Sequence, residues 1–318
     1  MKLLVIVLLF LFLTRCNNSR KQPSFVRIEQ LNAQQTLGRY LFFDKNLSSN
    51  KQLSCASCHQ PNHAFADTVA FSTGVFGRKA FRNTPSILNV NRSKSFHFDG
   101  AIPTLERQVI VPLLDHNEMN ASLPIVLQRL SRNSYYRFLA QKAFGKPIDA
   151  FVLTRALAAF ERTLRSRASK FDRYLAGNKT ILSVEEKRGW KLFSGKLNCI
   201  ACHPAPDFTT YGFATNGFTK SDEDNQGRFR ITGKEVDKGK FKIPSLRNCG
   251  ITSPYMHDGS VFTLIEVIKH YSNGGGLHVN QSNFIKKTPI TQKDVHAVQL
   301  FLMTLTDTIS YVKQGVYK

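Results

Sequence analysis

Long apolar runs, blocks of basic residues and strand-like patterns are all scarce in this sequence of 318 residues. The longest apolar run covers residues 3–13, which is too short to cross a bilayer. The net charge is +22, but the 44 Lys and Arg residues are scattered rather than gathered in blocks of about 5–8. Nucleic-acid binding therefore has little support. Alternation of apolar and polar residues is rare, which argues against a fold built on β-sheets.

The beginning of the chain has the pattern of an export signal. Lys2 precedes the short apolar run, as in a signal peptide. Residues 13–16, Leu-Thr-Arg-Cys, resemble a bacterial lipobox, which would place a lipid on Cys16 and leave residues 17–22 as a polar tether. Arg15 departs from the small residue that is usual there, so lipidation of Cys16 and plain cleavage both stay open. We expect residues 1–16 to be the signal and the mature chain to be exported.

The pattern Cys-x-x-Cys-His occurs twice, and it is the attachment signature of a c-type haem. Two cysteines three residues apart reach the two vinyl groups of one porphyrin, and the adjoining histidine lies under the iron. The alternative is a structural zinc site made of paired cysteines, but zinc requires no histidine directly after each pair. The pattern therefore predicts two covalent haems, held by Cys55, Cys58 and His59 and by Cys199, Cys202 and His203.

The remaining cysteines agree with this interpretation. Cys16 belongs to the export signal, and only Cys249 is left, so no pair remains for a structural disulfide. We expect Cys249 to be a buried small residue. Haem attachment of this kind takes place outside the bacterial inner membrane, so the sequence predicts a periplasmic protein.

The length and the 42% hydrophobic content suit two globular domains. A Gly-x-x-Leu-Phe segment precedes each haem motif, at residues 38–42 and 189–193, and the motifs lie far enough apart for separate domains. Helical spacing of apolar residues occurs at 125–139, 150–164 and 291–305, the last with Thr291 as N-cap. We predict an all-α fold of two cytochrome c-like haem domains with long loops, at residues 17–180 and 181–318.

The segments around the motifs resemble the bacterial di-haem cytochrome c peroxidases, including their relative MauG. The resemblance runs from about residue 38 to residue 305, in the family's order and near its spacing. It depends on residues 82–86 (Arg-Asn-Thr-Pro-Ser), 98–100 (Phe-Asp-Gly), Gln108, Glu118, 246–248 (Leu-Arg-Asn), 252–259 (Thr-Ser-Pro-Tyr-Met-His-Asp-Gly) and 270–271 (His-Tyr).

The resemblance implies that the first haem, at His59, reacts with peroxide. Gln108 and Glu118 match a family pair over its distal face, and Pro112 matches a proline that shapes the pocket. A carboxylate with a raised pKa can move a proton from the inner to the outer peroxide oxygen, and Gln108 can hold peroxide by hydrogen bonds. Many relatives block this haem with a histidine, but the corresponding place falls near Val75. The first haem is therefore expected to be open.

The resemblance assigns electron entry to the second haem, at His203. Tyr271 matches the tyrosine that is the sixth ligand in MauG, whereas many relatives use a methionine. Met256, Met303 and His270 remain alternatives, and Tyr271 as a packed aromatic is a further one.

Further expectations concern the electron relay, a calcium site and the oligomeric state. A family tryptophan that relays electrons is replaced by Phe98, which is harder to oxidise, and Trp190 and His63 are expected in the core and in a surface loop. The family's calcium site, made of one Asn side chain and two carbonyls, matches Asn83, Thr252 and Pro254. The resemblance also leaves a homodimer open.

The sequence therefore predicts a periplasmic enzyme that reduces hydrogen peroxide to water with electrons from a small cytochrome c or cupredoxin. The basic charge favours an acidic donor. Two alternatives stay open: a MauG-like enzyme that oxidises residues of a partner protein, and a non-catalytic di-haem electron carrier.

Overall fold

The computed structural model describes residues 31–218 and 226–307. The predicted export signal and Cys16 lie outside the described residues. The fold is all-α with long loops, as predicted. Its α-helices are α1 (Ala33–Phe43), α2 (Cys55–Cys58), α3 (Leu105–Gln108), α4 (Ile110–Leu114), α5 (Leu123–Arg132), α6 (Ser134–Phe144), α7 (Ala150–Glu161), α8 (Lys170–Leu175), α9 (Val184–Ser194), α10 (Phe229–Thr232), α11 (Leu264–Ser272) and α12 (Gln292–Met303).

Short elements fill the loops between these helices. The 3₁₀ turns are η2 (Lys45–Leu47), η3 (Pro61–His63), η4 (Val75–Gly77), η5 (Val90–Arg92), η6 (Cys199–Ala201), η7 (Glu235–Asp237) and η8 (Cys249–Ile251). Two short strands, β1 (Phe213–Ala214) and β2 (Phe241–Lys242), pair antiparallel. Within the described part, no helix has both the length and the apolar character needed to cross a membrane.

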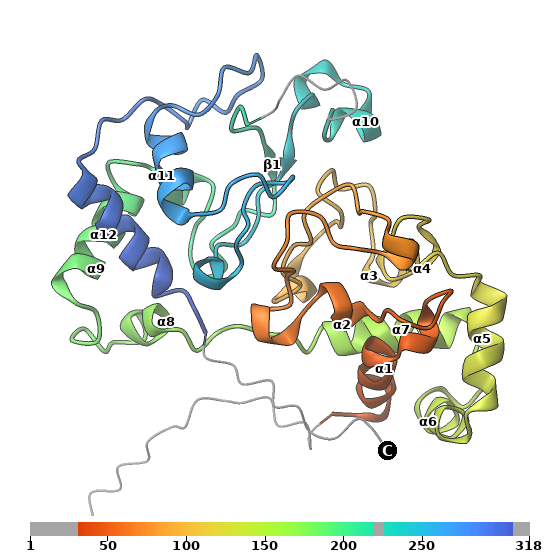
Figure 1. Cartoon of the computed structure of the whole chain (residues 1–318). Coiled ribbons are helices and arrows are strands. Elements are labelled where there is room, and N and C mark those ends of the chain that lie inside the picture. Colours follow the sequence, from red (N-terminus) through yellow and green to blue (C-terminus); the bar gives the residue numbers. More distant parts are fainter. Residues whose placement is uncertain (1–30, 219–225, 308–318) are drawn as a thin grey trace, which may run out of the picture.

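Helices α1–α7 lie in one half of the molecule and α8–α12 in the other (Figure 1). The first hydrophobic core contains buried residues from Leu37 to Leu164, and the second contains residues from Phe171 to Leu305. The packing changes from one core to the other between Leu164 and Phe171. The domain boundary at residues 180 and 181 stays a prediction.

The repeated Gly-x-x-Leu-Phe segment has the same packing role in both halves. Gly38 of α1 faces α7 so closely that a Cβ would overlap the carbonyl oxygen of Ala156, and Gly189 of α9 meets Ala297 of α12 in the same way. Only glycine allows two helix backbones to approach this closely. The sequence repeat is therefore also a structural repeat, in which the helix before each haem motif packs closely against the last helix of its half.

Helix ends follow local sequence signals. Thr291 is the N-cap of α12 and exchanges hydrogen bonds with Asp294, as the sequence predicted for Thr291. Residues 125–139, which show continuous helical spacing, are divided between α5 and α6 at Asn133. The Asn133 side chain accepts from the backbone N–H groups of Tyr135 and Tyr136, which starts a new helix there.

The two halves are joined by ion pairs and backbone hydrogen bonds. Arg92 of the first half lies 2.6 Å from Asp207 of the second. The backbone N–H of Lys242 in β2 donates to the carbonyl oxygen of Phe98 at 2.6 Å. The residue at the expected relay position is therefore in direct backbone contact with the second half.

Candidate active site

The first haem motif forms α2 and the turn that follows it. His59 Nδ1 lies 3.0 Å from the carbonyl oxygen of Phe65. A carbonyl oxygen only accepts, so Nδ1 carries the proton and Nε2 remains as the atom with a lone pair. Burial lowers the pKa of His59, which favours the neutral imidazole that metals bind.

The second motif repeats this geometry. His203 Nδ1 lies 2.9 Å from the carbonyl oxygen of Phe208, and burial lowers the pKa of His203 as well. Phe65 and Phe208 are both buried, and both have left-handed backbone conformations, with φ of 57° and 54°. In each half, the backbone carbonyl of a buried phenylalanine therefore orients the motif histidine.

The cysteine pairs belong to different cores. Cys55 packs against the first hydrophobic core and Cys199 against the second. The two pairs therefore cannot supply four ligands to one zinc ion, which disfavours that alternative. Cys249 is buried, as the sequence predicted, and Trp190 packs against the second core.

Glu118 lies in the turn after α4 and faces the first motif. Burial, together with the charge of Asp115, raises the pKa of Glu118 to about 7. Burial also raises the pKa of Cys58 to about 11, and the charges of Asp67 and Glu118 add to that increase. The carboxyl group of Glu118 thus lies within electrostatic range of the first motif, and it titrates near neutral pH.

Gln108 and Pro112 lie just before this turn, on α3 and α4. The carbonyl oxygen of Pro112 accepts from the backbone N–H of Met119, which ties the Glu118 turn back to α4. Gln108 Oε1 is one of the few buried side-chain oxygens in the described part that have no hydrogen-bond partner. A buried acceptor of this kind needs a donor from a bound molecule or a water molecule to complete its hydrogen bonds.

Val75 lies against the Glu118 turn. The Val75 backbone N–H donates to the carbonyl oxygen of Glu118 at 2.8 Å, and the Val75 side chain is buried. At the preceding Gly74, a Cβ would overlap the carbonyl oxygen of Asn117. The loop is therefore held close to Glu118, and it presents there a side chain that has no metal-binding atom.

Tyr271, at the end of α11, faces the second motif. Burial raises the pKa of Tyr271 to about 12, a hydrogen bond from Asn216 acts in the opposite direction, and Cys199 and Cys202 add to the increase. Asn216 Nδ2 lies 3.1 Å from Tyr271 Oη and 3.6 Å from Met256 Sδ. One amide therefore contacts both leading candidates for the sixth ligand.

The other two candidates have different surroundings. His270 Nε2 lies 3.0 Å from the carbonyl oxygen of Asn216, so this nitrogen is already engaged. Met303 is 42% exposed on α12, and its sulfur lies beside Gly250. The identity of the sixth ligand stays a prediction, with Tyr271 first and Met256 as the alternative.

The chain is similar to known proteins over most of its length. A family model described as di-haem cytochrome c peroxidase matches residues 32–180. The methylamine utilization protein MauG of Methylorubrum extorquens is 36% identical over 272 residues, covering 85% of this chain and 77% of that protein. The chain belongs to the di-haem cytochrome c peroxidase and MauG family.

MauG proteins and cytochrome c peroxidases match this chain at comparable sequence identity. Cytochrome c551 peroxidase of Nitrosomonas europaea is 32% identical over 274 residues, covering 85% of this chain and 79% of that protein. A crystal structure of a MauG-like protein associated with microbial copper homeostasis has a TM-score of 0.81 at 35% identity, and covers 90% of this chain and 93% of that one. The resemblance inferred from the sequence is thus confirmed at the level of the family.

Membership of the di-haem family implies two covalently bound c-type haems. The described residues fit this requirement. Each half has a motif cysteine packed against its core and a partly buried histidine whose Nδ1 faces a backbone carbonyl oxygen, which leaves Nε2 as the acceptor. Gln108 adds a buried amide oxygen without a partner in the first half.

The predicted calcium ligands lie on segments that pack together. The backbone N–H of Asn83 donates to the carbonyl oxygen of His257 at 3.1 Å, which brings Asn83 beside the segment that contains Thr252 and Pro254. The segments come from different halves of the molecule. Calcium binding by Asn83, Thr252 and Pro254 stays a prediction.

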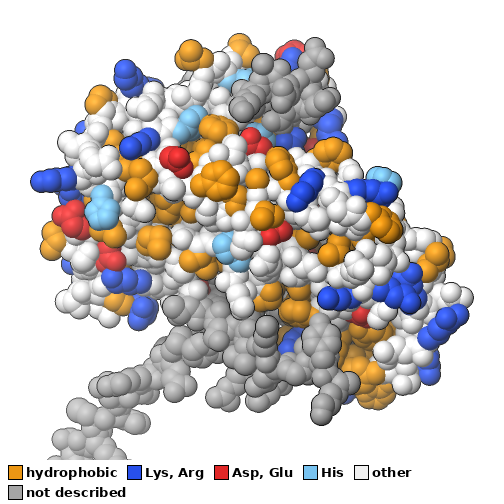
Figure 2. Space-filling model, in the orientation of Figure 1, with side chains coloured by type: hydrophobic (Ala, Val, Ile, Leu, Met, Phe, Trp, Pro, Cys, Tyr) orange, Lys and Arg blue, Asp and Glu red, His pale blue; other side chains and the backbone are white. Residues whose placement is uncertain are grey.

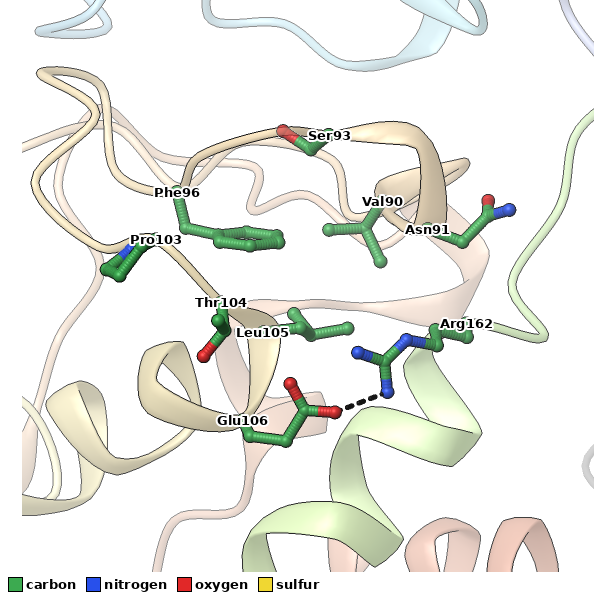
Figure 3. Close-up of a pocket in the computed structure, with 9 residues that line it drawn as sticks. All are labelled: Val90, Asn91, Ser93, Phe96, Pro103, Thr104, Leu105, Glu106 and Arg162. Carbon is green, nitrogen blue, oxygen red and sulfur yellow. Dashed lines mark ion pairs between the residues drawn. The ribbon is translucent and has the colours of Figure 1, made fainter.

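A cavity of about 190 Å³ lies in the first half, between η5, the start of α3 and the residue after α7 (Figure 3). An ion pair of 2.7 Å between Glu106 and Arg162 lies on one side, and Phe96 is part of the lining. None of the predicted site residues lines this cavity, so it is separate from the candidate active site.

Some residues of the site were not predicted from the sequence. Phe65 and Phe208 follow their motif histidines by six and five residues, so comparison of the two repeats could have found them. Asn216 carries no sequence signal of its own. His63, expected in a surface loop, is half-buried, and its Nε2 lies 3.0 Å from the carbonyl oxygen of Ser253 in the other half.

Proposed function

We propose that this protein is a periplasmic peroxidase. It converts hydrogen peroxide, two protons and two reduced donor molecules into two water molecules and two oxidised donors. When bound, the haems would supply redox-active irons, one to react with peroxide and one to exchange electrons. The observation that carries this proposal is Glu118, a carboxyl group with a pKa of about 7 beside the first motif.

Glu118 acts as the proton carrier. In its ionised form it accepts the proton of the inner peroxide oxygen and then delivers that proton to the outer oxygen, so that the O–O bond breaks and the outer oxygen leaves as water. Two electrons from the donor and two further protons convert the inner oxygen into the second water molecule. The buried amide of Gln108 holds peroxide by hydrogen bonds, and Pro112 keeps the Glu118 turn in place through Met119. Val75 leaves this site free of a blocking protein ligand.

The second site receives electrons from a small cytochrome c or cupredoxin. With 44 basic and 22 acidic residues, the chain attracts an acidic donor over a long range. Tyr271 is the proposed sixth ligand, with Met256 as the alternative. Phe98 is poorly suited to relay electrons as a radical, so transfer passes through packed groups and the Phe98–Lys242 backbone contact.

The decisive experiment is an electron paramagnetic resonance spectrum of the resting holoprotein, followed by peroxide addition and a turnover assay with reduced cytochrome c. The proposal predicts a high-spin signal that changes on peroxide addition, together with steady oxidation of the cytochrome. Two low-spin, six-coordinate irons whose spectra do not change on peroxide addition would instead identify a non-catalytic electron carrier.

Two observations favour a second candidate function, a MauG-like enzyme that oxidises residues of a partner protein. Val75 stands where many peroxidases have a blocking histidine, and Tyr271 meets Asn216 beside the second motif. Phe98 counts against this function, because long-range oxidation of a protein is helped by an easily oxidised aromatic residue. Peroxide-dependent oxidation of a protein substrate without cytochrome turnover would support it.

Localisation and calcium belong to the same proposal. The export signal places the mature chain in the periplasm, and a lipid on Cys16 would tether it to a membrane. A calcium ion held by Asn83, Thr252 and Pro254 would join segments of the two halves and fix the separation of the haems.

A further inference from the structure

The outer side of α6 and the start of α7 expose aromatic side chains away from both haem motifs. Tyr135, Phe138 and Phe151 are 44%, 57% and 46% exposed. The inner side of α6 buries Tyr136, Leu139 and Ala140 in the first core, so Phe138 on the outer side lies outside that packing. Exposure of large aromatic side chains to water costs free energy, so this surface is suited to contact with a partner.

The stretch of chain that carries this surface is basic. Lys142 Nζ lies 5.9 Å from the ring centre of Phe138, and the Arg155 guanidinium lies 3.7 Å from that of Phe151. Residues 120–160 contain one acidic residue, Asp149, and six basic ones, a net charge of +5. The basic residues are Arg129, Arg132, Arg137, Lys142, Lys146 and Arg155. Figure 2 shows Lys and Arg side chains beside hydrophobic ones at the lower right, where Figure 1 places α5 and α6.

We propose that this α6–α7 surface, formed by Tyr135, Phe138, Lys142, Phe151 and Arg155, docks on a membrane that contains anionic phospholipids. Aromatic rings are stable at the boundary between headgroups and acyl chains. Long cationic side chains cover those rings and extend their charged ends to lipid phosphates. The pairing of a cation with each exposed phenylalanine fits this interface better than it fits a purely apolar protein partner.

The first described residues lie close to this surface. Gln34, in the first turn of α1, donates from Nε2 to the carbonyl oxygen of Ala143 in α6 at 3.4 Å. The described chain begins at Leu31, three residues before Gln34. Cys16 lies 15 residues before Leu31, and a chain of that length spans at most roughly 50 Å. A lipid on Cys16 would therefore hold the α6–α7 surface near the membrane, but the docking itself does not require the lipid.

The experiment uses the haem-loaded chain from residue 17 onward, so that neither the apolar run of residues 3–13 nor a lipid on Cys16 contributes to binding. Co-sedimentation with vesicles of phosphatidylglycerol and phosphatidylethanolamine is compared with vesicles of phosphatidylcholine. We expect binding to the anionic vesicles only, and we expect it to weaken as salt is added. Phe138→Ser should weaken binding about tenfold, and Lys142→Glu should weaken it at least fivefold.

Phe284→Ser is the matched control. Phe284 is 58% exposed, nearly the same as Phe138, but it lies in the second half of the chain. The control should bind as the unaltered protein does, and haem spectra should be the same in all variants. Equal loss in Phe138→Ser and Phe284→Ser, or no loss in Phe138→Ser and Lys142→Glu, would overturn the proposal. So would a concentration-dependent dimer that Phe138→Ser abolishes, because the occupant would then be a second copy of this chain.

Discussion

Replacing Glu118 by glutamine should lower turnover and raise stability at the same time. The substitution keeps the size of the side chain but removes its ability to carry a proton, so peroxide turnover should fall by roughly 10²–10⁴-fold. In the unaltered enzyme, the proton-accepting form of Glu118 becomes scarce below its pKa of about 7. The turnover rate should therefore fall about tenfold for each pH unit below that value.

The stability effect follows from the same pKa. Burial raises the pKa of Glu118 from 4.5 to about 7, so ionisation disfavours the folded state. This cost is absent below pH 4.5, grows as the pH rises, and is complete above about pH 7, where it reaches at most about 3 kcal/mol. Glutamine carries no charge, so the variant should be more stable than the unaltered protein at pH 8 and equally stable near pH 4. Urea midpoints of the haem-loaded proteins at the two pH values measure this difference.

Glu106→Gln is the matched control. The hydrogen bond with Arg162 lowers the pKa of Glu106, so its charge favours the folded state and its removal should slightly destabilise the protein at pH 8. Turnover should be unchanged, because Glu106 lies outside the site. A Glu118→Gln protein that is less stable at pH 8, or that turns over at the full rate, would refute the proposed environment and role of Glu118.

Three further outcomes are expected. Asn216→Leu removes the amide that contacts both Tyr271 and Met256, which should favour methionine ligation and raise the reduction potential of the second haem. Potentiometry and near-infrared spectra check this, and an unchanged potential would contradict it. Gly189→Ala places a methyl group against the Ala297 carbonyl, so the urea midpoint should fall by an amount equivalent to about 1–3 kcal/mol; a fully stable variant would show that the helix contact is looser. Turnover with an acidic donor should fall steeply as salt is added, and a rate independent of salt would remove the role of charge in donor binding.

Much of the fold follows from local sequence. Cys-x-x-Cys-His specifies haem attachment because two thiols and an imidazole must meet one porphyrin. The required spacing of these three groups is set within five consecutive residues. Thr291 and Asp294 define the start of α12 because capping is a contact between neighbours in the chain. The repeated glycines at positions 38 and 189 were visible as a pattern, although only the structure shows which helix each one meets.

The electrostatics of the site are decided by tertiary structure. The amino-acid sequence determines that residue 118 is a carboxylate, and only the resemblance to the family assigns it to the first haem. Its pKa of about 7 depends on burial and on Asp115. Asn216, Met256 and Tyr271 are far apart in the chain and meet only after α11 has packed on the second core. Contacts between distant segments, and the exclusion of water that accompanies them, have no local pattern, so they become visible only when the chain is folded.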